Sequence, residues 1–77
     1  MKVRKVQAVI YIFKTLLERG SIRKKDIQRV ISIQDVAFRR YIQEIRAYLV
    51  NFNEPYELVY IKSKDAYFLK RLNMSIK

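Results

Sequence analysis

One segment of the chain, from Gly20 to Ile45, constrains the fold more than any other. It contains two helix-like stretches separated by only a few residues, and the second stretch carries adjacent arginines, Arg39 and Arg40. Further along, two short runs rich in Tyr, Val, Ile and Phe have the composition of strands. The order of these elements predicts a pair of closely linked helices followed by a β-hairpin.

The spacing of apolar residues predicts three helices, over about residues 2–19, 23–31 and 35–50. In the first helix, four residues at i, i+4, i+7 and i+11 are expected to face the core: Val6, Ile10, Phe13 and Leu17. A second apolar stripe lies beside the first and widens the band: Val9, Ile12 and Leu16. The same four-residue spacing recurs in the third helix: Phe38, Ile42, Ile45 and Leu49. Three residues of the second helix are expected to point inward: Ile27, Val30 and Ile31.

Turn residues divide the chain between these elements. Gly20 stands where a left-handed cap would end the first helix, and Ser21 and Ile22 are expected to be extended. Asp35 falls in the first turn of the third helix, where the positive end of the helix dipole stabilises a carboxylate. Strands are expected over residues 57–61 and 66–70, joined by a polar turn, and residues 72–77 are expected to fray. The predicted fold class is α+β, a single domain over residues 1–77 made of a three-helix bundle and a small antiparallel β-hairpin.

The charge of the chain indicates the class of partner. Seventeen Lys and Arg residues against seven Asp and Glu give a net charge of +10, and the pI is about 10.2. Such an excess favours a polyanion as the partner.

The residue types that the chain lacks argue against an enzyme. It contains no cysteine and no histidine, which removes disulfides, thiolate zinc ligation and the commonest general base. Its single glycine excludes a glycine-rich phosphate loop, and its carboxylates form no close pair by spacing. Neither catalysis nor a metal or other cofactor is expected.

The N-terminal segment raises the question of membrane targeting. It begins with basic residues and continues with apolar ones, as a signal peptide does, but four polar residues interrupt it and no small-residue cleavage site follows: Gln7, Lys14, Glu18 and Arg19. No run of apolar residues is long enough to predict a membrane span. A folded amphipathic helix and a cytoplasmic location are therefore expected.

Apolar and arginine positions between residues 27 and 45 form a pattern: Ile27, Ile33, Phe38, Arg39, Arg40, Ile42 and Ile45. This pattern resembles the helix-turn-helix of DeoR-type bacterial regulators, roughly L-a-e-l-f-g-V-S-x-x-T-I-R-R-D-L-x-x-L. Tyr67-Phe68-Leu69 is similar to the end of the wing strand in the broader group that includes the BirA-like and Mga-like modules. The chain departs from the family pattern at five positions: Ser32, Gln34, Ala37, Tyr41 and Ala66. The resemblance implies a winged helix-turn-helix and a sequence-specific DNA-binding module in transcriptional regulation.

This interpretation assigns a set of contacts to double-stranded DNA. Residues on one face of the third helix would read the major groove: Gln34, Val36, Arg39, Arg40, Gln43 and Arg46. Lys62 and Lys64 at the hairpin turn would contact the backbone or the minor groove. Phosphates would be held at the start of the second helix by Arg23, Lys24 and Lys25. The alternative for each group is an ordinary solvated surface.

Other functions stay open at this level. Many winged helices bind proteins, so the chain could be an adaptor for an acidic partner, and an RNA-binding role ranks third. Exposed tyrosines could cover a small core, stack on single-stranded nucleic acid or line a dimer interface. A homodimer on a palindromic site is expected, through three residues of the first helix: Val9, Tyr11 and Ile12. An apolar patch beside Tyr11 and Ile12 would favour a protein partner.

Overall fold

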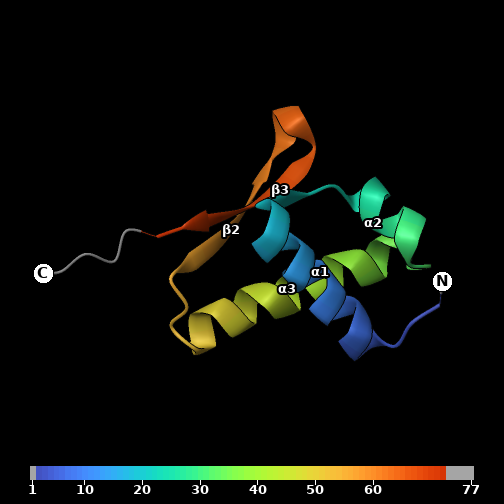
Figure 1. Ribbon diagram of the computed structural model, residues 1–77, viewed down its shortest axis with the longest axis horizontal. Coiled ribbons are helices and arrows are strands. Elements are labelled where there is room, and N and C mark those ends of the chain that lie inside the picture. Colours follow the sequence, from blue (N-terminus) through green and yellow to red (C-terminus); the bar gives the residue numbers. More distant parts are fainter. Residues whose placement is uncertain (1, 73–77) are drawn as a thin grey trace, which may run out of the picture.

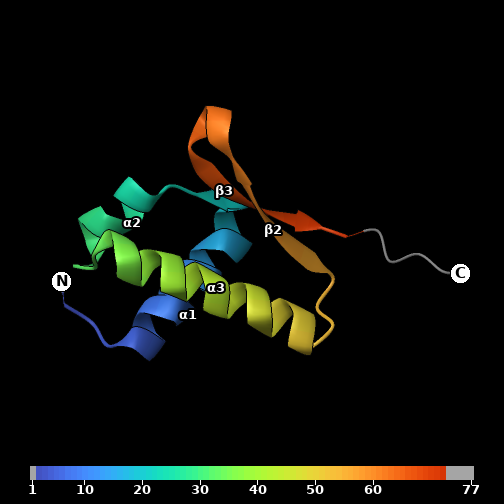
Figure 2. The same cartoon turned by 180° about the vertical axis from the view of Figure 1, so that it is seen from behind.

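The computed structural model describes residues 2–72 and consists of three helices packed against a three-stranded antiparallel sheet (Figures 1 and 2). It confirms the predicted α+β class and the order of the elements. These are, in chain order, α1 (Lys5–Arg19), β1 (Ser21–Ile22), α2 (Lys24–Val30), α3 (Asp35–Asn51), β2 (Tyr56–Ile61), a 3₁₀ turn (Lys62–Lys64) and β3 (Ala66–Arg71). In the described part of the chain, no helix has the length and apolar content that crossing a membrane requires.

Strand β3 lies at the centre of the sheet, between β1 and β2. Its pairing with β2 runs from Tyr56 opposite Arg71 to Ile61 opposite Ala66, and its pairing with β1 places Ser21 opposite Phe68. Because β1 directly follows α1 and precedes α2, this pairing brings the end of α1 and the start of α2 beside the β2–β3 hairpin. Segments far apart in the sequence thus meet at the β1 edge of the sheet (Figure 1).

Helix α3 contributes the predicted stripe to the core. Phe38 is fully buried, and Ile42, Ile45 and Leu49 are no more than 4% exposed. The ring of Phe38 packs edge-on against Tyr67 of β3, with 5.6 Å between ring centroids. This contact fixes α3 on the sheet, so the opposite face of α3 is left to solvent.

Helix α1 uses a different stripe from the one predicted. Ala8, Ile12 and Leu16 are fully buried, whereas Val6, Ile10 and Leu17 are 67, 60 and 49% exposed. The prediction that Val6, Ile10 and Leu17 face the core is therefore wrong. Two apolar stripes lie side by side on this helix, and only contact with α3, β1 and β3 decides which of them is covered.

Smaller differences concern the ends of elements. Helix α1 begins at Lys5 rather than Lys2, and each predicted strand gains one residue at its outer end. Ile27 of α2 and Ile31, the extended residue that follows the helix, are buried as predicted. Val30 is 42% exposed, because a seven-residue helix presents only a narrow face to the core. Apart from Leu72, the expected fraying of the C-terminal tail falls outside the described residues.

Gly20 ends α1 as predicted. Its φ of 84° is the left-handed conformation that favours glycine, and its N–H donates to the Leu16 carbonyl at 2.7 Å. The Gly20 carbonyl then accepts a hydrogen bond from Leu69 N–H at 2.9 Å. One residue therefore turns the chain out of the helix and attaches it to β3.

Candidate nucleic-acid interface

The solvent face of α3 is cationic and open. Val36, Arg39, Arg40 and Gln43 are all exposed, and they lie opposite the buried stripe of the same helix. Within residues 2–72, neither Arg39 nor Arg40 forms an ion pair. Their guanidinium groups are therefore available to an anionic ligand. Val36 adds an apolar side chain, 58% exposed, to the same face.

Arg46 occupies the margin of this face and has a structural contact. It is half-buried, and its Nε donates a hydrogen bond to the Leu58 carbonyl at 3.3 Å. The contact ties α3 to the middle of β2. Arg46 therefore stands apart from Arg39 and Arg40, with which the sequence grouped it.

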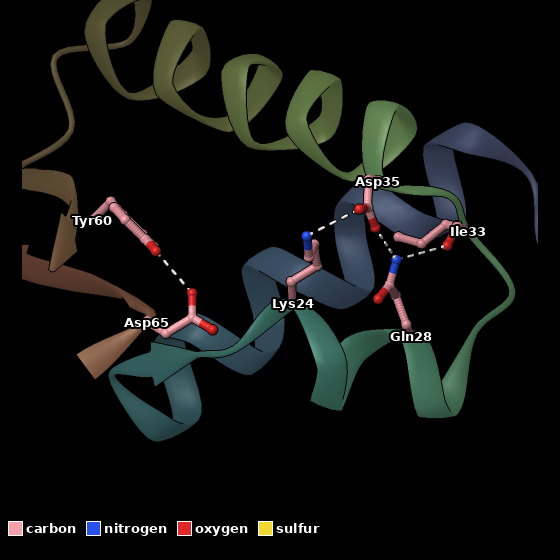
Figure 3. A network of polar contacts seen from close by, with 6 residues as sticks. All are labelled: Lys24, Gln28, Ile33, Asp35, Tyr60 and Asp65. Carbon is pink, nitrogen blue, oxygen red and sulfur yellow. Dashed lines mark hydrogen bonds and ion pairs between the residues drawn. The ribbon is translucent and has the colours of Figure 1, made fainter. Parts of the chain in front are cut away.

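A polar network holds the start of α3 against α2 (Figure 3). The carboxylate of Asp35 accepts a hydrogen bond from Gln28 Nε2 at 2.9 Å and lies 3.2 Å from Lys24 Nζ. Gln28 Nε2 also lies 3.1 Å from the Ile33 carbonyl in the connecting turn. The hydrogen bond from Gln28, and then the contact with Lys24, hold the pKa of Asp35 below its usual value. The network fixes the relative position of the two helices.

This network separates the three cations that were predicted to hold phosphates. Lys24 is engaged with Asp35 and only partly exposed, whereas Arg23 and Lys25 are exposed. The sequence alone did not indicate the Lys24–Asp35 pair, because it depends on how the turn at residues 31–34 folds α2 back on α3.

A cationic concavity lies between the end of α1, the start of α2 and the hairpin. Arg19, Arg23 and Lys64 line it, together with Phe68 of β3. Asp26 is also in its wall but lies 3.4 Å from Arg29, and within the described residues none of the three cations has an ion-pair partner. Sequence reasoning missed Arg19. The only available signal was its position just before the extended segment that pairs with β3.

The tip of the hairpin presents Lys62 and Lys64, both exposed, on the 3₁₀ turn. Asp65 follows in the left-handed conformation, with a φ of 48°, and accepts a hydrogen bond from the Tyr60 hydroxyl at 2.8 Å (Figure 3). That hydrogen bond raises the pKa of Tyr60 above its usual value. It also closes the turn, so the two lysines are presented from an ordered hairpin end.

A second concavity lies at the N-terminal end of α3. It is lined by the turn residues Ile33 and Gln34, by Val36 and Arg40 of α3, and by residues that precede α1, including Lys2. Gln34 is exposed and forms no side-chain cap on the helix. Arg40 of α3 therefore shares this concavity with Lys2 and with the turn that precedes the helix.

The acidic side chains of the described residues are dispersed. Among them, no three Asp or Glu side chains are grouped so that they could hold a metal ion. Comparison with protein-family models, curated proteins and solved structures finds no match to this chain. Its function is therefore inferred from the geometry of its own residues.

Proposed function

We propose that this protein is a winged helix-turn-helix that binds double-stranded DNA and acts in transcriptional regulation. In this assignment α2 and α3 are the helix pair, and the β2–β3 hairpin is the wing. The observation that carries the proposal is the solvent face of α3, where Arg39, Arg40 and Gln43 project from a helix anchored by its opposite side. Arginine can bond guanine O6 and N7, and glutamine can bond adenine.

The remaining cations suit the phosphate backbone. Lys62 and Lys64 lie at the hairpin tip, and Arg23 and Arg19 lie in the concavity beside it. Contacts of this kind position a protein on the duplex without reading its sequence. Val36 supplies an apolar contact of the type that recognises a thymine methyl group.

Duplex binding can be measured by fluorescence anisotropy in rising salt. With a net charge of +10, affinity is expected to fall steeply between about 50 and 200 mM salt, because bound counterions are released. Single-stranded DNA and duplex RNA, run in parallel, are expected to bind more weakly. An affinity for duplex DNA that does not change with salt would contradict the proposal.

A pair of charge-matched variants separates α3 from the overall charge. Arg39→Ala with Arg40→Ala, and Lys14→Ala with Lys70→Ala, each remove two exposed cations. On a duplex selected from a random pool, each arginine change is expected to weaken binding by about 1–3 kcal/mol and to relax sequence preference. The lysine pair is expected to change only the non-specific component. Equal effects of the two double variants would refute readout by α3.

A second candidate function rests on a different observation. Val6, Ile10 and Leu17 of α1 are exposed, which is unusual for a soluble surface of this size and typical of a protein contact. In this alternative the chain is an interaction module for an acidic partner. It becomes the leading candidate if the Arg39 and Arg40 double variant binds its selected duplex with unchanged affinity and selectivity.

A further inference from the structure

The exposed apolar stripe of α1 extends onto α3. Val6, Ile10 and Leu17 follow one face of α1, and Phe13 lies half-buried between them. Phe13 packs edge-on against Tyr48 of α3 with 5.8 Å between ring centroids, and Tyr48 lies against Phe52 at 4.8 Å. An apolar groove runs along this seam between the helices, lined chiefly by Val9, Ile10, Phe13 and Tyr48. The surface is therefore continuous rather than a set of isolated side chains.

Two neutral ion pairs lie beside this surface, whereas the molecule as a whole is strongly cationic. Lys5 pairs with Glu44 at 3.4 Å, and Lys14 pairs with Glu18 at 3.7 Å. Two lysines and two glutamates thus sum to zero beside the stripe, while the whole chain carries +10. Two copies of this protein repel each other over most orientations, and this is a side on which they can approach.

The spacing of the stripe is the same in both directions along the helix. The intervals between Val6, Ile10, Phe13 and Leu17 are four, three and four residues. A second α1 laid antiparallel on the first, about a twofold axis, places Val6 against the second copy's Leu17 and Ile10 against the second copy's Phe13. Such a self-complementary patch is what a twofold interface requires.

We propose that the protein forms an antiparallel homodimer through the α1 stripe. Tyr48 and Phe52 of α3 extend the contact at the side of each α1. Arg39 and Arg40 are exposed and lie opposite the buried stripe with which α3 packs on the rest of the fold. The ribbons of α1 and α3 are nearest the viewer in opposite views, α1 in Figure 1 and α3 in Figure 2. The dimer therefore leaves Arg39 and Arg40 uncovered. The part of the earlier dimer prediction that rested on Ile12 is wrong, because Ile12 is fully buried in its own chain.

Sedimentation equilibrium without nucleic acid tests the dimer independently of DNA binding. The apparent mass is expected to rise with concentration toward twice the 9.4 kDa of one chain. Ile10→Lys would place two charges at the centre of the interface and is expected to weaken the dimer at least about tenfold, which is about 1.4 kcal/mol. Val50→Lys, at a 75% exposed valine on the other side of α3, is the matched control and should dimerise as the wild type does. A monomeric wild type at all concentrations, or equal behaviour of the two variants, would overturn the proposal.

Disulfide trapping tests the orientation. The chain contains no cysteine, so single cysteines can be introduced without background. Val6 and Leu17 lie about 16 Å apart along the helix at 1.5 Å per residue, and a disulfide requires Cα atoms within about 7 Å. Antiparallel packing therefore predicts that V6C and L17C chains, mixed and oxidised, form mixed dimers, while either chain alone does not crosslink. Crosslinking of each chain with itself, or no crosslinking in the mixture, would contradict the antiparallel dimer. A monomer that is captured only by an acidic protein would instead support the adaptor function.

Discussion

Helices α1 and α3 carry the same apolar spacing and use it in opposite ways. In α3 the four residues at i, i+4, i+7 and i+11 fill the core, and Phe38 is fully buried. In α1 the same spacing, from Val6 to Leu17, lies largely in solvent. The difference arises because another side of α1 meets the core: Ile12 and Leu16 of its second stripe are fully buried, together with Ala8, and Val9 is half-buried. A helix with one apolar stripe has only one way to pack, whereas a helix with two has a face left over for another molecule.

The largest effect is expected from truncating the first position of the α3 stripe. Phe38→Ala should destabilise the fold by about 3–5 kcal/mol, a large part of the stability of so small a domain. Ile10→Ala, on the α1 stripe, should change it by no more than about 0.5 kcal/mol, since Ile10 is 60% exposed. Urea unfolding followed by circular dichroism, at concentrations too low for self-association, measures both. A similar loss in the two variants would show that the α1 stripe is part of the core.

A pair of neighbouring leucines sharpens the comparison within α1 itself. Leu16 is fully buried and Leu17 is 49% exposed, so the same substitution tests two faces of one helix turn. Leu16→Ala is expected to destabilise by about 2–5 kcal/mol, and Leu17→Ala much less. If thermal unfolding showed a larger loss of stability for Leu17→Ala than for Leu16→Ala, the stripe that contains Leu17 would be the one that faces the core.

The difference between α1 and α3 also shows how much of the packing could be predicted from sequence. The buried stripe of α3 is confirmed, and it could be predicted because the apolar spacing of this helix defines one face. The same spacing put Arg39, Arg40 and Gln43 on the exposed side, where they lie in the structure. The orientation of α1 could not be predicted, because periodicity does not rank two adjacent stripes. Packing against other elements does, and those contacts are distant in sequence.

The candidate interface was predictable to a similar degree. Spacing placed Val36, Arg39, Arg40 and Gln43 on the exposed side of α3, but Arg46, which was grouped with them, is half-buried and contacts β2. The pair of Lys24 with Asp35 could not be predicted from spacing, because it forms only when the turn brings α2 against α3. Arg19 was missed for the same kind of reason, since β1–β3 pairing brings it beside Arg23 and Lys64.

The two helices also end differently, which predicts a smaller effect. Helix α1 ends at Gly20 with a φ of 84°, whereas after α3 the left-handed residue is Asn53, with a φ of 51°. Apart from Gly20 and its chain neighbours, no atom of residues 2–72 would lie within 4 Å of a Cβ at Gly20, so the strain in Gly20→Ala would come from φ. That strain is expected to lower stability by about 1–2 kcal/mol. Asn53→Gly, the converse change, should leave stability nearly unaltered, since glycine adopts this conformation freely. Equal losses at both sites, measured by urea unfolding, would argue against this account of the two ends.

The smallest effect concerns how the two helices begin. Helix α1 has no acid in its first turn, whereas α3 has Asp35, which Gln28 and Lys24 contact. Because these contacts lower the folded-state pKa of Asp35 below its usual 3.8, the stabilisation is fully present above that value. It is lost as the pH falls through the lower, folded-state pKa. Asp35→Asn should therefore be less stable than the wild type at neutral pH, and the gap should close in acid. Gln28→Ala removes the main cause of the pKa shift of Asp35. When Asp35→Asn is made in the Gln28→Ala variant, the stability lost should therefore depend less on pH than when it is made in the wild type. Urea midpoints measured across this pH range test both variants, and a gap between wild type and Asp35→Asn that stays constant with pH would show that Asp35 does not link α2 to α3 through its charge.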